Sequence, residues 1–115
     1  MLTVEALREW GADVDEGLNR CMNNEMFYLR MVGMLEKDTQ MEELEQALAQ
    51  GDLKQAFEKA HALKGVLANL ALKPALKPIS ELTELLRASA QTDYGPLVAE
   101  AKREMTALKA MMKQG

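Results

Sequence analysis

Apolar residues recur at intervals of three and four along most of the chain, which is the period of an α-helix. Strand-type alternation of apolar and polar residues is absent. The seven glycines and three prolines are too few to interrupt the helical pattern often. The pattern predicts an all-α protein.

Two short helices are predicted at the N-terminus. The first follows Thr3 and ends near Trp10. The second is opened by Asp13, whose side chain combines with an acidic residue three positions on in a variant of the capping box, and it runs toward Met22.

A third helix begins after Asn23 or Asn24 and continues through Leu35. Its residues between positions 26 and 35 are apolar nearly all round. Helices of this kind are usually central to a bundle or covered by another segment, and we expect this one to be buried in the same way.

Four further helices are predicted downstream, at residues 39–50, 53–70, 74–86 and 96–112. Gly51 ends the first of them and Asp52 caps the next. Pro74 suits a first helical turn, whereas Pro78 predicts that the start of this helix is kinked or delayed.

The connections between these helices are short, so neighbouring helices should pack antiparallel. We therefore expect an antiparallel four-helix bundle with one or two short additional N-terminal helices. Residues 1–115 should form a single domain, with the short helices in 1–22 and the bundle in 24–112. Most of the nine methionines lie at core spacing, so we interpret them as core residues in preference to a promiscuous binding groove.

Composition excludes several classes of protein and site. The 115 residues suit one domain, and an apolar content of 48% excludes intrinsic disorder. With only Cys21 and only His61, the chain has neither a disulfide framework nor a paired-histidine metal motif, and Ser80 and Ser89 lie outside any nucleophile elbow. No phosphate-binding loop is present and the chain lacks a set of metal ligands, so we expect no metal and no cofactor. The absence of a signal peptide or long apolar run indicates a cytoplasmic protein.

His61 is predicted to lie off the core face of its helix. Its ring falls about 120° from the centre of that face and should be exposed. Gly65 costs up to about 1 kcal/mol relative to alanine inside a helix, which favours a need for close approach to the backbone. Together with Ala68 it leaves an open lane beside the imidazole, with Lys64 on the other side. The core face itself contains Leu53, Ala56, Phe57, Ala60, Leu63, Leu67 and Leu70.

Charge is distributed unevenly along the chain. Residues 52–79 contain five lysines and two acidic residues, a net charge of +3, whereas the remainder carries −7. Such a basic surface suits an anion or an acidic partner. The negative total of −4 and the aromatic content of 4% argue against nucleic acid. Alternatively, His61 is an ordinary surface histidine and Lys64 a solvated charge.

The string AHALKGVLANLAL at residues 60–72 resembles the signature of the histidine-containing phosphotransfer (HPt) domains of bacterial two-component relays. The Gly-Asp-Leu sequence at 51–53 is similar to the lead-in that precedes the histidine helix in that family. The resemblance covers about residues 13–112. The positions that match the signature are His61, Leu63, Lys64 and Gly65.

The resemblance implies that a phosphoryl group moves between a receiver-domain aspartate and His61. Lys64 would offset phosphate charge. Arg87 would add a second cation, or would be a solvated charge at the end of its helix. Gly65 and Ala68 would border the partner.

Three positions depart from the family pattern. Ala71 stands where a turn glycine is expected, and because alanine tolerates the left-handed conformation poorly, this predicts a differently built corner. Thr83 stands where the family commonly has Glu or Gln next to the active histidine, so a direct hydrogen bond to the imidazole is expected to be lost or water-mediated. Pro78 is unusual in a helix that faces the site.

The sequence thus predicts a phosphoryl carrier without kinase activity of its own. Its partners would be receiver domains and a hybrid sensor histidine kinase, with no nucleic acid and no membrane, and the chain itself would be a monomer. The alternative is a degenerate HPt-like module that binds receiver or kinase domains without transfer. The identity of these partners, the direction of phosphate flow, and whether the chain is free-standing or part of a larger kinase stay open at this stage.

Overall fold

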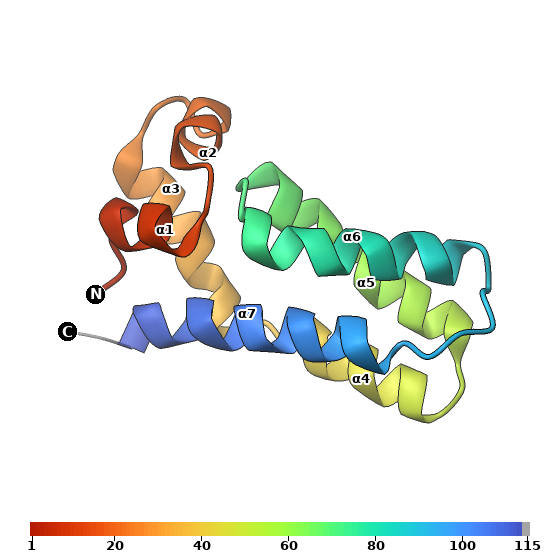
Figure 1. The fold of residues 1–115 in the computed structure, drawn as a ribbon. Helices are drawn as coiled ribbons and strands as arrows, with labels where there is room; N and C mark the ends of the chain where they lie inside the picture. Colours follow the sequence, from red (N-terminus) through yellow and green to blue (C-terminus); the bar gives the residue numbers. More distant parts are fainter. Residues whose placement is uncertain (114–115) are drawn as a thin grey trace.

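The computed structural model describes residues 1–113 and shows a protein built of helices (Figure 1). Among these residues there is no strand, which confirms the predicted all-α class. The elements are α1 (Val4–Trp10), α2 (Val14–Arg20), α3 (Glu25–Gly33), the 3-10 turn η1 (Met34–Lys37), α4 (Gln40–Ala49), α5 (Leu53–Asn69), α6 (Lys73–Arg87) and α7 (Gly95–Lys113).

Helices α4 to α7 form the predicted antiparallel four-helix bundle (Figure 1). The bundle begins at Gln40 and not at residue 24 as expected, because α3 lies with α1 and α2 at its end, so three helices precede it in place of one or two. Helix α5 packs against α4 and α6, and α6 packs against α7. Helix α7 returns to α4 through two ion pairs, Lys102 with Glu45 at 3.4 Å and Lys109 with Glu42 at 3.7 Å. The histidine-bearing helix α5 is therefore held between two neighbours.

The predicted helix starts are confirmed where a side chain caps them. Oδ1 of Asp13, Asn24 and Asp52 each accepts a hydrogen bond from the backbone N–H three residues later, at 3.2, 3.0 and 3.0 Å. Asn24 caps α3, whereas Asn23 adopts a left-handed φ of 56° in the preceding turn. These caps satisfy N–H groups that the first helical turn leaves without partners.

Helices α1 to α3 gather at one end of the bundle (Figure 1). Trp10 joins α1 to α7, because its indole Nε1 donates a hydrogen bond to Glu104 Oε1 at 3.2 Å. Helix α3 contributes the fully buried Tyr28 and Val32 to the core.

The expected burial of α3 on all sides is wrong. Met26 is 77% exposed and Phe27 39% exposed. The physical reason is that α3 covers the end of the bundle, where one face meets the core and the other meets solvent. An apolar composition alone does not reveal which face is covered.

The interpretation of most methionines as core residues is confirmed by a narrow margin, for five of the nine. Only Met41 and Met105 are buried. Three more are partly buried against the core, namely Met31, Met111 and Met112. The remaining four are exposed, namely Met1, Met22, Met26 and Met34.

Helix α6 begins without the expected delay. It starts at Lys73, contains Pro74 in its first turn and continues through the buried Pro78. Pro78 lacks the N–H that would bond to the carbonyl four residues earlier, so only one hydrogen bond is lost, near the helix start.

Candidate functional site

Helix α5 presents His61 to solvent, as predicted. The opposite face of this 17-residue helix enters the core through the fully buried Ala56, Ala60, Leu63 and Leu67. Because the core side fixes the rotation of the helix, the imidazole stands on a rigid backbone and faces outward.

The imidazole stacks on Phe57, which lies one helical turn earlier. The ring centroids of Phe57 and His61 are 5.5 Å apart and the ring planes are inclined by 26°. Among the described residues, no side chain or backbone group forms a hydrogen bond with the imidazole of His61, so neither ring nitrogen is committed to the protein. The stack thus supports one face of the imidazole and leaves its nitrogens available.

The two predicted cations share one carboxylate. Lys64 Nζ lies 3.5 Å from Glu84 Oε2, and Arg87 Nε lies 3.5 Å from Glu84 Oε1. Arg87 also places its guanidinium carbon 5.1 Å from the centroid of the Phe57 ring, a cation–π geometry. Arg87 is therefore linked to the site through Phe57. Its role as a second cation at the phosphoryl group stays a prediction.

The basic window at residues 52–79 is largely neutralised in the folded protein. Lys59 pairs with Glu43 at 3.6 Å, and Lys73 pairs with Glu16 at 3.3 Å, in addition to the Lys64 pair described above. The acidic partners come from three other helices, so the local excess of lysine in the sequence does not translate into a free basic face. The expectation of such a face is corrected accordingly.

Thr83 is fully buried, and its hydroxyl donates a hydrogen bond to the Ile79 carbonyl at 2.7 Å within α6. A residue without exposed surface cannot border a docked partner, so the placement of Thr83 in a partner-facing site is wrong. The hydroxyl is satisfied by the preceding helical turn, which threonine does readily inside helices.

Gly65 and Ala68 line an open groove between α5 and the α3–η1 segment. A Cβ atom added at Gly65 would meet no other atom within 4 Å. The groove has a volume of about 640 Å³, and the exposed Met34 forms part of its opposite wall, with Arg20 and Asp38 also contributing. The groove supports the predicted lane beside the histidine and adds an apolar wall that the sequence did not reveal.

The corner after α5 has the left-handed geometry that glycine usually provides. Ala71 adopts φ 55°, and its carbonyl accepts a hydrogen bond from Asp13 N at 2.9 Å. The Tyr28 hydroxyl donates to the Leu70 carbonyl at 3.0 Å, and the close packing of Gly17 against this tyrosine holds α2 there. The expectation of a differently built corner is wrong, because these contacts hold alanine in the conformation.

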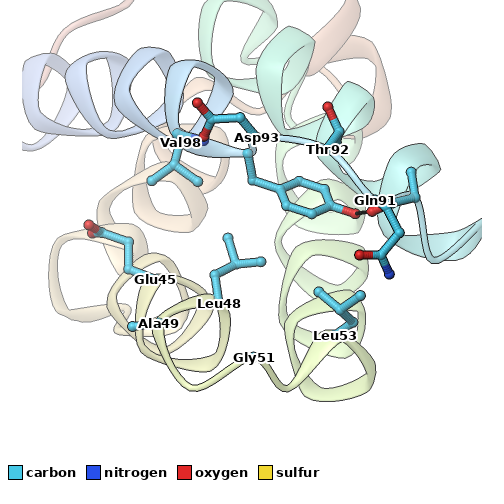
Figure 2. A pocket seen from close by; sticks show the side chains of 12 residues that line it. Glu45, Leu48, Ala49, Gly51, Leu53, Gln91, Thr92, Asp93 and Val98 are labelled. Carbon is cyan, nitrogen blue, oxygen red and sulfur yellow. Dashed lines mark hydrogen bonds between the residues drawn. The ribbon is translucent and has the colours of Figure 1, made fainter.

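A second hollow lies where α5 begins, between the end of α4 and the α6–α7 loop (Figure 2). It has a volume of about 570 Å³ and is lined by Leu48, Leu53 and Val98 together with polar loop residues. Leu53 and His61 are eight residues apart on α5, a rise of about 12 Å. Among the described residues, none of the predicted site residues lines this hollow.

Sequence reasoning missed Phe57 and Glu84 as neighbours of the site. Phe57 was assigned to the core face, although its position four residues before His61 places the two rings on adjacent turns. The three-residue spacing of Glu84 and Arg87 signalled their ion pair. The pairing with Lys64 carried no sequence signal, because it depends on the register of α6 against α5.

Within residues 1–113, no helix combines the length and the apolar character needed to cross a membrane. Over the same residues, no three side chains of histidine, cysteine, aspartate or glutamate gather closely enough to hold a metal ion.

Comparison with known proteins identifies the family. The family model described as the Hpt domain matches residues 34–113, which include α4 to α7 and the candidate site. Comparison with curated proteins and with solved structures found no match for this chain. Hpt domains are phosphocarrier modules that interact with receiver domains and histidine kinases in phosphorelays. Since the match covers well over half of the chain, this helical protein belongs to the Hpt domain family and has a phosphotransfer-type role in two-component signalling.

Proposed function

We propose that this protein relays phosphoryl groups, with His61 accepting one from a receiver-domain aspartate and passing it to the aspartate of another receiver. The observation that carries the proposal is the exposure of the only histidine, on the rigid helix α5, beside the open groove at Gly65. The family match supplies the reaction class.

The chemical step is a displacement at phosphorus. A neutral imidazole is nucleophilic near neutral pH. One ring nitrogen of His61 attacks the phosphorus of the aspartyl phosphate, the P–O bond to the aspartate breaks, and the aspartate leaves as a carboxylate. The ring loses its N–H proton to solvent. The second transfer reverses these events at the next receiver.

The residues of this chain provide orientation and charge. Phe57 supports one face of the imidazole. Lys64, three residues after His61, supplies a positive charge for the phosphoryl oxygens. In this proposal the receiver brings the divalent metal that such transfers use, and the carrier brings no catalytic machinery of its own.

The receiver is proposed to dock over Gly65 and Ala68, with its active-site loops in the groove beside them. A side chain at Gly65 would occupy the approach to the histidine, whereas glycine leaves the backbone accessible. We further propose that residues 1–115 act as one monomeric domain in the cytoplasm, with receiver domains and a hybrid sensor kinase as partners.

A second function is a module that binds receivers without transfer. It is favoured by one observation, the burial of Thr83, which leaves no side chain from that position of α6 to orient the imidazole. Transfer from a phosphorylated receiver separates the two functions.

The test uses receiver domains phosphorylated on aspartate with a small-molecule donor and then incubated with this protein. We expect the label to appear on the chain in an acid-labile, base-stable form, and to be absent from His61→Gln. Binding of a phosphorylated receiver without any label would establish the second function. Equal labelling of His61→Gln would overturn the assignment of the acceptor.

A further inference from the structure

We propose that Glu84 is a positioning residue that holds Lys64 while His61 is unphosphorylated and releases it when a phosphoryl group arrives. The inference rests on the proposed function. It adds a regulatory carboxylate on α6 to the carrier. This carboxylate lies next to Thr83, the position at which the HPt family commonly has Glu or Gln.

The geometry gives Glu84 two contacts that both lead to His61. One carboxylate oxygen faces Lys64 at 3.5 Å, and Lys64 follows His61 by less than one helical turn. The other oxygen faces Arg87 at 3.5 Å, and Arg87 lies over the Phe57 ring that stacks on His61. Glu84 thus contacts Lys64, whose charge lies beside the imidazole, and also Arg87, which packs against the stacking partner of the imidazole.

The contact is suited to exchange. The side chain of Glu84 is 60% exposed and that of Lys64 is 33% exposed. Exposed ion pairs at such distances stabilise proteins little, so breaking this pair costs little. A phosphoryl group carries up to two negative charges and three acceptor oxygens, and it therefore attracts Lys64 more strongly than one carboxylate does.

The consequence concerns the phosphorylated state. The negative charge of Glu84 remains near the phosphoryl group after Lys64 has moved, and it disfavours the dianionic form. Glu84 also competes for the lysine that would stabilise that form. Both effects weaken retention of phosphate on His61, which suits a carrier that must pass its phosphate on.

The test phosphorylates His61 with phosphoramidate and needs no receiver. The imidazole nitrogen attacks phosphorus, the P–N bond of the donor breaks, and the nitrogen of the donor leaves as ammonium with the proton that the ring loses. The acid dissociation of the phosphoryl monoanion is then followed by ³¹P NMR across neutral pH.

We compare Glu84→Gln with Glu43→Gln, which removes the same charge and also breaks an ion pair to α5, at Lys59. Lys59 and His61 are two residues apart and point in nearly opposite directions from the helix. In Glu84→Gln the dissociation constant of the phosphoryl monoanion should rise severalfold, because the variant removes a nearby negative charge and frees Lys64 for the phosphoryl group. In Glu43→Gln it should equal the wild-type value.

A double-variant cycle identifies the route of the effect. In a Lys64→Gln background, Glu84→Gln should change the dissociation constant less than in the wild type, because only the direct effect of the carboxylate charge remains once there is no lysine to compete for. A merely structural role of Glu84 would not produce this dependence. An unchanged constant in Glu84→Gln, an equal change in Glu43→Gln, or a full effect in the Lys64→Gln background would each overturn the inference.

The outcome is separable from that of the proposed function. A chain that phosphoramidate labels on His61 and that exchanges phosphate with no receiver would refute the relay and leave the Glu84 result standing. A chain that phosphoramidate does not label would overturn both proposals.

Discussion

Replacement of Gly65 by alanine should stabilise the protein. Gly65 lies in the interior of α5, and an added Cβ atom would meet nothing within 4 Å. The gain is therefore the helix-propensity difference alone, about 1 kcal/mol in the free energy of unfolding. For a chain of this length it corresponds to a rise in Tm of about 4 °C.

A second helical glycine supplies a control with the opposite sign. A Cβ atom added at Gly17 would lie 2.5 Å from Tyr28 Cε1 and 2.8 Å from the Leu70 carbonyl oxygen. Gly17→Ala makes the same chemical change in an overpacked position, and we expect it to lower the free energy of unfolding by about 1–3 kcal/mol. Thermal and denaturant unfolding of the two variants and the wild type measure both effects.

Replacement of Gly65 by leucine separates stability from function. The new side chain extends into open space, so the fold should be retained. It also stands one turn after His61, at the wall of the groove, and a displacement of the reacting atoms by about 1 Å costs on the order of 10²-fold in rate. We expect normal unfolding and severely reduced transfer from a phosphorylated receiver. Ala99→Leu, which adds an exposed leucine to α7, should transfer normally.

Two results would refute this reasoning. Normal transfer by Gly65→Leu would show that no partner approaches the backbone at this position. Destabilisation by both Gly65→Ala and Gly65→Leu would show that glycine is required there for the conformation or packing of the helix.

Three further predictions concern His61, nucleotide and Tyr28. His61→Gln should unfold within about 0.5 kcal/mol of the wild type, because it removes an exposed side chain, and a larger loss in denaturant unfolding would mean that the imidazole is structural. The isolated protein with Mg²⁺-ATP should stay unlabelled until a cognate kinase and its receiver are added, and autophosphorylation in a radiolabel assay would reveal a catalytic site in this chain. Burial raises the pKa of Tyr28 to about 12. Since tyrosine in an unfolded chain has a pKa of about 10, the stability that Tyr28 contributes should be complete below about pH 10 and lost as the pH rises toward about 12. Tyr28→Phe should abolish this part of the alkaline destabilisation in thermal unfolding, and an identical pH profile in the two proteins would contradict the argument.

The sequence was informative wherever one side chain decides a local structure. Asp13, Asn24 and Asp52 each predicted a helix start correctly, because a capping oxygen accepts its hydrogen bond from a backbone N–H only three residues away. The exposure of His61 followed from the helical period, since the rotation of α5 is set by the apolar residues within it.

The sequence was uninformative wherever the outcome depends on a distant segment. The exposed face of α3 depends on where the bundle ends, and the pairing of Lys64 with Glu84 depends on the register between two helices. At Ala71 the local preference and the tertiary contacts disagree. Alanine disfavours the left-handed conformation, but hydrogen bonds from Asp13 and Tyr28 to the carbonyls of residues 71 and 70 hold it there. Local preference predicted the wrong corner because it omits those contacts.

The hydrogen bond between Trp10 and Glu104 has an optical consequence. Trp10 is the only tryptophan in the chain, and its indole connects α1 to α7 across 94 positions of sequence. Its emission therefore reports whether α1 is docked, whereas far-ultraviolet circular dichroism reports mainly the long helices α5 to α7. Heating curves recorded with the two signals would coincide if the N-terminal helices and the bundle melt together, and the fluorescence curve would come first if α1 detaches from an intact bundle.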